Sequence, residues 1–176
     1  MLTQAFLDTL IIELVNKYCR GNGLDVGCGY RKLPGSVGVD IMAYGAMVNA
    51  DNDDPHLSQA DLCCDVRDLP FKTGSMDYVF SHHCLEHIGE MNVVDKDTAL
   101  ALQEWVRVLK VGGYLLLITP DINHCISPIA KHRGKIEPHG LEPKEVKPIL
   151  RELPLKVLRF NRLEDDNIFD IVARKL

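Results

Sequence analysis

Small groups of polar residues follow several apolar segments of this 176-residue chain, and their types suit the binding of a polar small molecule. Gly27 and Gly29 follow the apolar residues 24–26, where missing side chains let a ligand approach the backbone. Asp40 ends the next such segment and is placed to accept hydrogen bonds from ribose hydroxyls. Asp65 ends a third segment and is placed to accept from an exocyclic amine such as adenine N6.

A fourth group, Ser81-His82-His83, follows the apolar residues 76–80. In open α/β sheets, ligands bind at the carboxyl ends of the strands. Each feature alone is weak, since a glycine turn or a single acid after a strand is common. Their order along the chain, each at the end of a successive strand, is what indicates one binding site.

Hydrophobic periodicity predicts the elements that must position these groups. An amphipathic helix is expected first, with its apolar stripe at Leu7, Leu10, Ile11, Leu14 and Tyr18. Further helices are expected at 102–109, ended by Gly112-Gly113, and at 144–153, while 43–55 reads as a loop. Strands are expected at 24–26, 37–41, 61–66, 76–80, 114–118, 156–160 and 168–174.

The alternation of strands and helices predicts an α/β fold, with residues 1–176 forming a single domain. The expected sheet is Rossmann-like, doubly wound and mostly parallel, with a C-terminal antiparallel edge strand. Only 11 positions separate Gly29 from Asp40. Since a parallel crossover normally takes about a dozen residues or more, the first crossover helix is expected to be short or missing.

Three segments together resemble a known family, in sequence and in mutual spacing. They are LDVGCGYRKLPGSVGVD, DVRDLPFKTGSMDYVFSHHCLEHI and LQEWVRVLKVGGYLLLITPD, which span residues 24–121. The chain resembles the class I S-adenosylmethionine-dependent methyltransferases, specifically the small type 11 or UbiE-like group. The resemblance implies a Rossmann-like methyltransferase with S-adenosylmethionine as its cofactor.

The resemblance also implies which residues bind the cofactor. Asp25, Gly27 and Gly29 would line its methionine part, and Asp40 would hold the ribose hydroxyls. The remaining expected contacts are Ile41 beside Asp40, Asp65 at the adenine amine, Val66 beside the ring, and Ser81 and His82 near the cofactor's amino group.

Histidine is the usual general base for a hydroxyl acceptor, and His83 and His124 are the expected catalytic residues. Both are predicted at the mouth of the pocket. His83 and His87 are four residues apart, as in a helical zinc site. The HExxH pattern, however, requires glutamate directly after the first histidine, and Cys84 holds that position, so no metal is expected.

NAD is the nearest rival cofactor for the same residues. The dinucleotide pattern GxGxxG requires a third glycine, opens a helix and has an acid about 20 residues on. Here Lys32 occupies the third glycine position, and Asp40 comes early. A pyrophosphate would also lack a helix N-terminus, so S-adenosylmethionine is favoured.

The composition limits partners and location. The formal net charge of −5 disfavours nucleic acid, whose phosphates are bound by basic surfaces. No apolar run reaches the roughly 20 residues that span a bilayer. Six cysteines without a CxxC pair favour a reducing cytoplasm. The oligomeric state stays open, a homodimer included.

The expected reaction is methylation of a small-molecule or glycan-like acceptor, with oxygen favoured as the acceptor atom. Two alternatives remain: a non-catalytic S-adenosylmethionine-binding partner subunit, and an RNA-modifying methyltransferase. The polar composition of residues 122–140 suggests a lid over the pocket.

Overall fold

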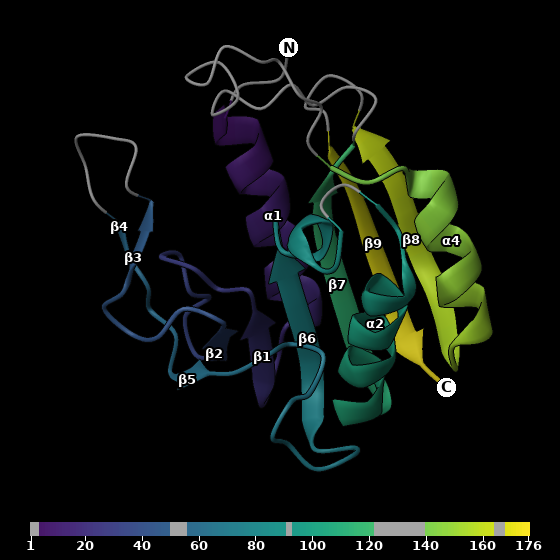
Figure 1. Cartoon of the computed structure of the whole chain (residues 1–176). Helices are drawn as coiled ribbons and strands as arrows, with labels where there is room; N and C mark the ends of the chain where they lie inside the picture. Colours follow the sequence, from purple (N-terminus) through teal and green to yellow (C-terminus); the bar gives the residue numbers. More distant parts are fainter. Residues whose placement is uncertain (1–3, 50–55, 91–92, 122–139, 164–167) are drawn as a thin grey trace.

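The computed structural model describes residues 4–49, 56–90, 93–121, 140–163 and 168–176 (Figure 1). Its helical elements are α1 (Gln4–Tyr18), the 3-10 helix η1 (Leu85–His87), α2 (Lys96–Val108) and α4 (Pro143–Glu152). Its strands are β1 (Gly23–Val26), β2 (Val37–Asp40), β3 (Met47–Asn49), β4 (His56–Leu57), β5 (Leu62–Cys63), β6 (Met76–His82), β7 (Leu109–Pro120), β8 (Leu155–Leu163) and β9 (Ile168–Lys175).

Seven strands form one sheet in the order β5-β2-β1-β6-β7-β9-β8. The first five of these run parallel, and β9 pairs antiparallel with both β7 and β8. The predicted doubly wound, mostly parallel sheet is confirmed, with its antiparallel pairing at the C-terminal edge. Within that edge, β8 takes the outermost place and β9 lies one position in. Because β1 lies between β2 and β6, the carboxyl ends of β1 and β6 form the switch point where such sheets bind ligands.

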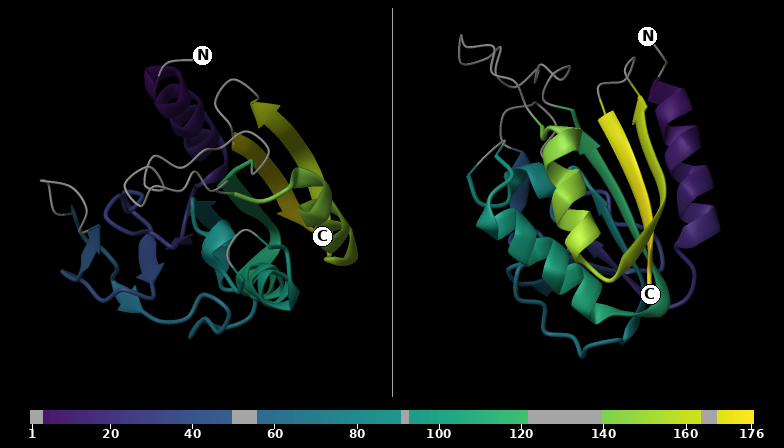
Figure 2. Two further views of the ribbon diagram at one scale, coloured as in Figure 1. Left: turned by 45° about the horizontal axis from the view of Figure 1, so that its top comes forward. Right: turned by 90° about the vertical axis from the view of Figure 1, so that its right-hand side faces the viewer.

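Helices cover both faces of the sheet, α1 on one and α2 with α4 on the other (Figures 1 and 2). Beneath α1, Leu14 packs with Tyr78, Phe80 and Leu116. The larger core lies on the α2 and α4 face, around the fully buried Trp105. In the described part of the chain, no helix is long and apolar enough to cross a membrane.

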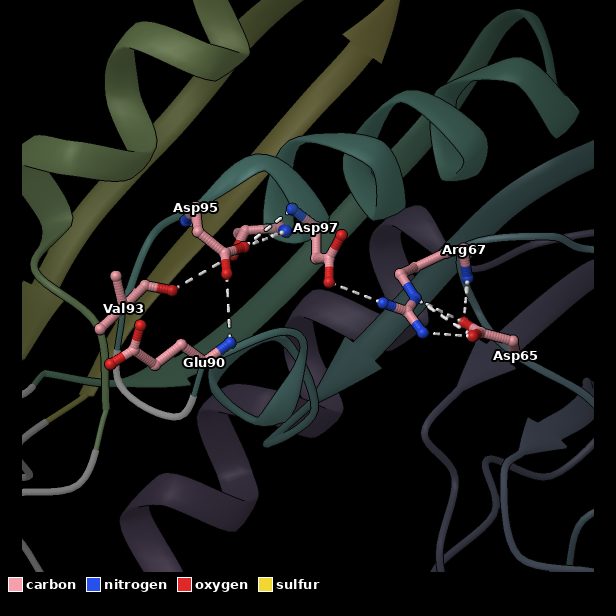
Figure 3. Close-up of polar contacts among 7 residues, drawn as sticks. Asp65, Arg67, Glu90, Val93, Asp95 and Asp97 are labelled. Carbon is pink, nitrogen blue, oxygen red and sulfur yellow. Dashed lines mark hydrogen bonds and ion pairs between the residues drawn. The ribbon is translucent and has the colours of Figure 1, made fainter.

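Helix α2 begins at a capping box and ends earlier than its sequence suggests. The Asp95 carboxylate accepts hydrogen bonds from the Asp97 and Thr98 amides, which satisfies two free donors of the first turn (Figure 3). The prediction that Gly112-Gly113 ends this helix is wrong. The helix stops at Val108, Leu109 adopts an extended conformation, and β7 runs through both glycines.

The crossover between β1 and β2 contains no helix, as predicted. Residues 27–36 form only turns, bends and irregular backbone. Gly35 is left-handed with φ of +82°, and the Leu33 amide donates to Asp25 Oδ2 at 2.6 Å. A tight loop held by a buried carboxylate therefore replaces the first crossover helix.

Two short strands lie within and directly after the segment that the sequence predicts as a loop. β3 and β4 pair antiparallel as a separate two-stranded sheet, so the loop prediction for 43–55 is wrong within its described part. The segment is rich in Asp and Asn and lacks the alternation that marks a strand. The third predicted strand is shorter than expected, because only Leu62 and Cys63 pair with β2.

Candidate cofactor and active site

The turn after β1 packs tightly against the segment that follows β6. Gly27 is left-handed with φ of +70°, and its amide donates to the Val39 carbonyl at 2.8 Å. A Cβ atom at Gly27 would lie 2.3 Å from the Cys84 sulfur. Only glycine fits this backbone conformation and this space, so the glycine requirement expected from the sequence has a steric cause here.

Two buried carboxylates flank the glycine turn. Asp25 is 2% exposed within β1, and Asp40 is 9% exposed at the end of β2. Asp40 accepts from the Gly29 amide and from the Met42 amide, each at 2.9 Å. Asp40 therefore connects the turn after β1 to the segment after β2, at the carboxyl edge where the sequence predicts a ribose contact.

Asp25 is electrostatically unusual. Burial raises the pKa of its carboxyl group to about 7, and the neighbouring charge of Asp40 acts in the same direction. The hydrogen bond from the Leu33 amide opposes this shift in pKa. A buried carboxyl group whose pKa is raised toward neutrality is typical of functional sites.

Asp65 lies two residues beyond β5 and is held by an arginine (Figure 3). Its Oδ2 accepts from Arg67 Nη2 at 2.6 Å, and its Oδ1 accepts from the Arg67 amide at 2.9 Å. Arg67 Nη1 also donates to Asp97 on α2 at 2.8 Å. The hydrogen bonds from Arg67 lower the pKa of Asp65, which keeps this carboxylate ionised as an acceptor.

The apolar residues predicted beside the cofactor differ in exposure. Ile41, directly after Asp40, is 68% exposed, whereas Val66 is 9% exposed and belongs to the core. The Val66 carbonyl accepts from Trp105 Nε1 at 2.9 Å. Ile41 is thus free to contact a ligand, while Val66 is anchored next to Asp65.

Strand β6 ends with polar residues beside β1. Ser81 is 2% exposed, and its backbone pairs in register with Val26 immediately before the glycine turn. Burial lowers the pKa of the next residue, His82, to about 3, and His83 and Arg31 add to this effect. His82 is therefore neutral at physiological pH. Its ring meets that of His83 edge to face, with centroids 4.6 Å apart.

His83 is held in a conformation that few non-glycine residues adopt. Its φ is +56°, and its amide donates to the Ile118 carbonyl of β7 at 2.9 Å. Its Nδ1 lies 3.3 Å from Glu86 Oε1, in a carboxylate that is completely buried. The His83 side chain itself is 45% exposed. Left-handed backbone at such a position is typical of functional sites.

His124 and the proposed lid at residues 122–140 lie largely outside the described residues, so the catalytic prediction for His124 stays a prediction. Within the described ranges, no group of three or more His, Cys, Asp and Glu side chains is arranged to hold a metal ion.

Sequence reasoning overlooked three contributors to this site. Arg67 orients Asp65, Glu86 contacts His83, and Cys84 fills the space beside Gly27. The i, i+2 spacing of Asp65 and Arg67 is a usable signal, since an Asp side chain in a turn can bond to the backbone two residues on. No sequence pattern indicates the other two, because their contacts depend on the turn after β6.

Taken together, these residues suit a ligand with a nucleoside and a charged amino-acid part. The carboxylates lie at three successive strand ends, and the glycine turn leaves backbone accessible. The helix N-terminus that a pyrophosphate requires is missing from the first crossover. S-adenosylmethionine, which has no pyrophosphate, fits these residues better than NAD.

A family model described as a methyltransferase domain matches residues 24–117, more than half of the chain. The chain belongs to this methyltransferase family. It is an S-adenosylmethionine-dependent methyltransferase with a Rossmann-like fold, and the family expected from the sequence is confirmed. No curated protein sequence matches the chain significantly.

Solved structures agree with this fold at low sequence identity. An S-adenosylmethionine-dependent methyltransferase of Methanosarcina mazei is 20% identical, with a TM-score of 0.61 over 93% of this methyltransferase and 97% of that chain. Geranyl diphosphate C-methyltransferase of Streptomyces coelicolor was solved with Mg²⁺ and S-adenosyl-L-homocysteine. It is 17% identical, with a TM-score of 0.60 over 96% of this methyltransferase and 76% of that chain. A putative methyltransferase in complex with the Trm112 activator of Haloferax volcanii is 19% identical, with a TM-score of 0.56 over 87% of this methyltransferase and 81% of that chain.

Proposed function

We propose that this methyltransferase methylates an oxygen atom of a small-molecule or glycan-like acceptor, with His83 as the general base. The observation that supports this most is the geometry of His83. It lies just past the carboxyl end of β6, half exposed, with its Nδ1 3.3 Å from the buried Glu86 carboxylate. A histidine held by a carboxylate at one nitrogen presents its other nitrogen to an acceptor hydroxyl.

The cofactor would be held by the residues at the carboxyl edge of the sheet. Asp40 suits the ribose hydroxyls, Asp65 the adenine amine, and Asp25 with the glycine turn the methionine part. S-adenosylmethionine supplies a methyl group already activated on a sulfonium. The protein's main task is therefore to align acceptor and methyl group, and a base adds to this when the acceptor is a hydroxyl.

His83 would take the proton of the acceptor hydroxyl at Nε2. Glu86 would keep the ring oriented and would stabilise the imidazolium that forms. His82, whose low pKa keeps it neutral, adds no competing positive charge beside His83. The pair of adjacent histidines thus divides into one partly buried neutral ring and one more exposed ring.

The charge of the protein and its first crossover support the proposed acceptor class. A net charge of −5 opposes a long polyanion such as RNA. The missing crossover helix leaves Ile41 and the glycine turn uncovered by a helix.

The five described cysteines are free thiols, which supports a reducing cytoplasm. The main-sheet strands among the described residues form one continuous sheet, which supports a single domain.

Calorimetry with S-adenosylmethionine, S-adenosylhomocysteine and NAD tests the cofactor site first. A tritiated-methyl transfer screen over oxygen, nitrogen and carbon acceptors then tests the reaction. We expect both adenosyl compounds to bind, NAD not to bind, and label to appear on hydroxyl acceptors.

Each other outcome has a defined meaning. Transfer only to nitrogen or carbon would overturn the oxygen assignment. Transfer to RNA would make the enzyme an RNA methyltransferase. Cofactor binding without transfer to any acceptor would favour a non-catalytic partner subunit.

A further inference from the structure

A groove of about 340 Å³ lies at the edge of the sheet opposite the cofactor site. The end of α1, the start of β7 and the end of β9 form it. Its charged lining consists of Lys17, Arg20, Lys110, Arg174 and Asp77. Four cations and one acid thus share one groove, in a chain whose net charge is −5. The groove is therefore positively charged, although the protein as a whole carries a net negative charge.

Only one of these cations is neutralised by a carboxylate of the groove. Lys110 Nζ forms an ion pair with Asp77 Oδ1 at 2.6 Å. Lys17 Nζ instead lies 5.1 Å from the centre of the Tyr18 ring. Arg20 Nε donates to the Asn16 carbonyl at 2.9 Å, and Arg174 Nε donates to the Gly112 carbonyl at 3.2 Å. The contacts of Lys17, Arg20 and Arg174 are thus with an aromatic ring and backbone carbonyls, which leave their positive charges unneutralised within the groove.

Stabilisation of a helix end explains part of this arrangement. Lys17 and Arg20 lie at the C-terminus of α1, where cations favourably meet the helix dipole. Lys110 and Arg174 come from β7 and β9, so the dipole does not account for them. Gly112 is left-handed with φ of +84°, and a Cβ atom there would lie 3.2 Å from Arg174 Nη2. The bare glycine therefore gives the guanidinium its space.

We propose that this groove is a second ligand site, which binds a small phosphorylated compound. Phosphate groups match arginine and lysine donors, and prearranged cations lower the cost of ordering on binding. The groove volume is within the range of small-molecule sites, about 300–1,000 Å³. The tilted pair of Tyr18 and Tyr114, with centroids 5.2 Å apart, adds an apolar wall for a base or sugar.

A small ligand fits this site better than a nucleic acid. The groove has the volume of a small-molecule site, and the net negative charge of the protein repels a long polyanion. The groove also lies apart from the methyl-transfer chemistry. Asp77 is near the start of β6, whereas His82 is at its opposite end. A ligand here would act as an effector or a docking group and not as the methyl acceptor.

Titration calorimetry with pyrophosphate and with ADP tests the proposal. Saturating S-adenosylhomocysteine is present throughout, so that ADP cannot occupy the cofactor site. The groove variant is Lys17→Gln/Arg174→Gln. The matched control, Lys96→Gln/Arg151→Gln, removes the same charge from exposed positions elsewhere. Thermal melting confirms that both variants are folded.

We expect both probes to bind the wild type, with ADP the tighter because of the tyrosine wall. The groove variant should lose at least about tenfold in affinity, the effect of one charge-assisted contact, and the control should bind like the wild type. No binding to the wild type, or equal losses in both variants, would overturn the proposal. Tight binding of single-stranded oligouridylate with neither small probe bound would assign the groove to nucleic acid instead.

Discussion

Gly27 and Cys84 lie so close that a Cβ atom on the glycine would be 2.3 Å from the cysteine sulfur. The contact joins the turn after β1 to the residues after β6, the two strand ends at the switch point of the sheet. The Cys84 Cβ would be equally close, at 2.4 Å. Any side chain at Gly27 would therefore separate the two sides of the candidate cofactor site.

Gly27→Ala is expected to destabilise the protein and to abolish cofactor binding. Alanine at φ of +70° costs about 1–2 kcal/mol, and overpacking against Cys84 adds about 1–3 kcal/mol. Gly35→Ala is the matched control, because φ there is +82° and nothing lies within 4 Å of the added Cβ. Chemical denaturation and calorimetry with S-adenosylhomocysteine measure both effects. Equal losses in the two variants would show that backbone strain alone matters at Gly27.

Sequence patterns predicted those parts of the fold that depend on local periodicity. Apolar runs placed the strands of the parallel sheet, and the position of Asp40 at the end of β2 followed from them. The interval of 11 positions from Gly29 to Asp40 predicted that the first crossover helix would be short or missing. These features are local, so one stretch of sequence contains the information.

Features that depend on distant contacts were not predicted. The β3–β4 pair has no alternation to reveal it, and α2 stops at Val108 although helix formers continue to Lys110. The left-handed backbone of His83 is the clearest example. This backbone conformation occurs where His83 contacts both β7 and Glu86. No neighbouring glycine or proline in the sequence indicates it.

Asp65→Ala is expected to weaken S-adenosylhomocysteine binding by about tenfold, the effect of one charge-assisted hydrogen bond. The reason is the predicted contact with the adenine amine. S-inosylhomocysteine lacks that amine, so its affinity should not change. Arg67→Ala should give a smaller loss for the adenosyl compound, because Asp65 then remains but is no longer held by the guanidinium. Competition binding measures the affinities of both ligands for the wild type and for both variants. A loss shared by both ligands would place Asp65 away from the amine.

Asp25→Asn is expected to stabilise the free protein at pH 8. The folded-state pKa of Asp25 is about 7, above the value of roughly 4 expected for an unfolded chain. Between these two values the folded state binds more protons, so this group makes stability fall as pH rises. Asparagine removes that titration and can still accept from the Leu33 amide. Denaturation at pH 5 and pH 8 should show a gain at pH 8 that shrinks at pH 5.

The same substitution should weaken cofactor binding. If Asp25 lines the methionine part, its ionised form favours the cationic ammonium and sulfonium, and the affinity of the wild type should rise from pH 6 to pH 8. Calorimetry in buffers of different ionisation enthalpy would detect the proton released near pH 6.5. A pH-independent affinity in the wild type would remove Asp25 from the methionine subsite.

His83→Gly is expected to lower kcat by about a hundred- to ten-thousandfold, the usual contribution of a general base. Glycine adopts the left-handed backbone that His83 occupies, so folding and cofactor affinity should be retained. Added imidazole should restore part of the activity, which a purely structural role would not allow.

Glu86→Gln should lower kcat less, with the acceptor KM unchanged. It should cause no further loss of kcat in the His83→Gly background, because Glu86 acts through His83. His87→Asn is the control, since His87 is 51% exposed and its Nε2 lies 3.9 Å from Glu86 Oε1. Full activity of His83→Gly without imidazole would remove His83 from the reaction.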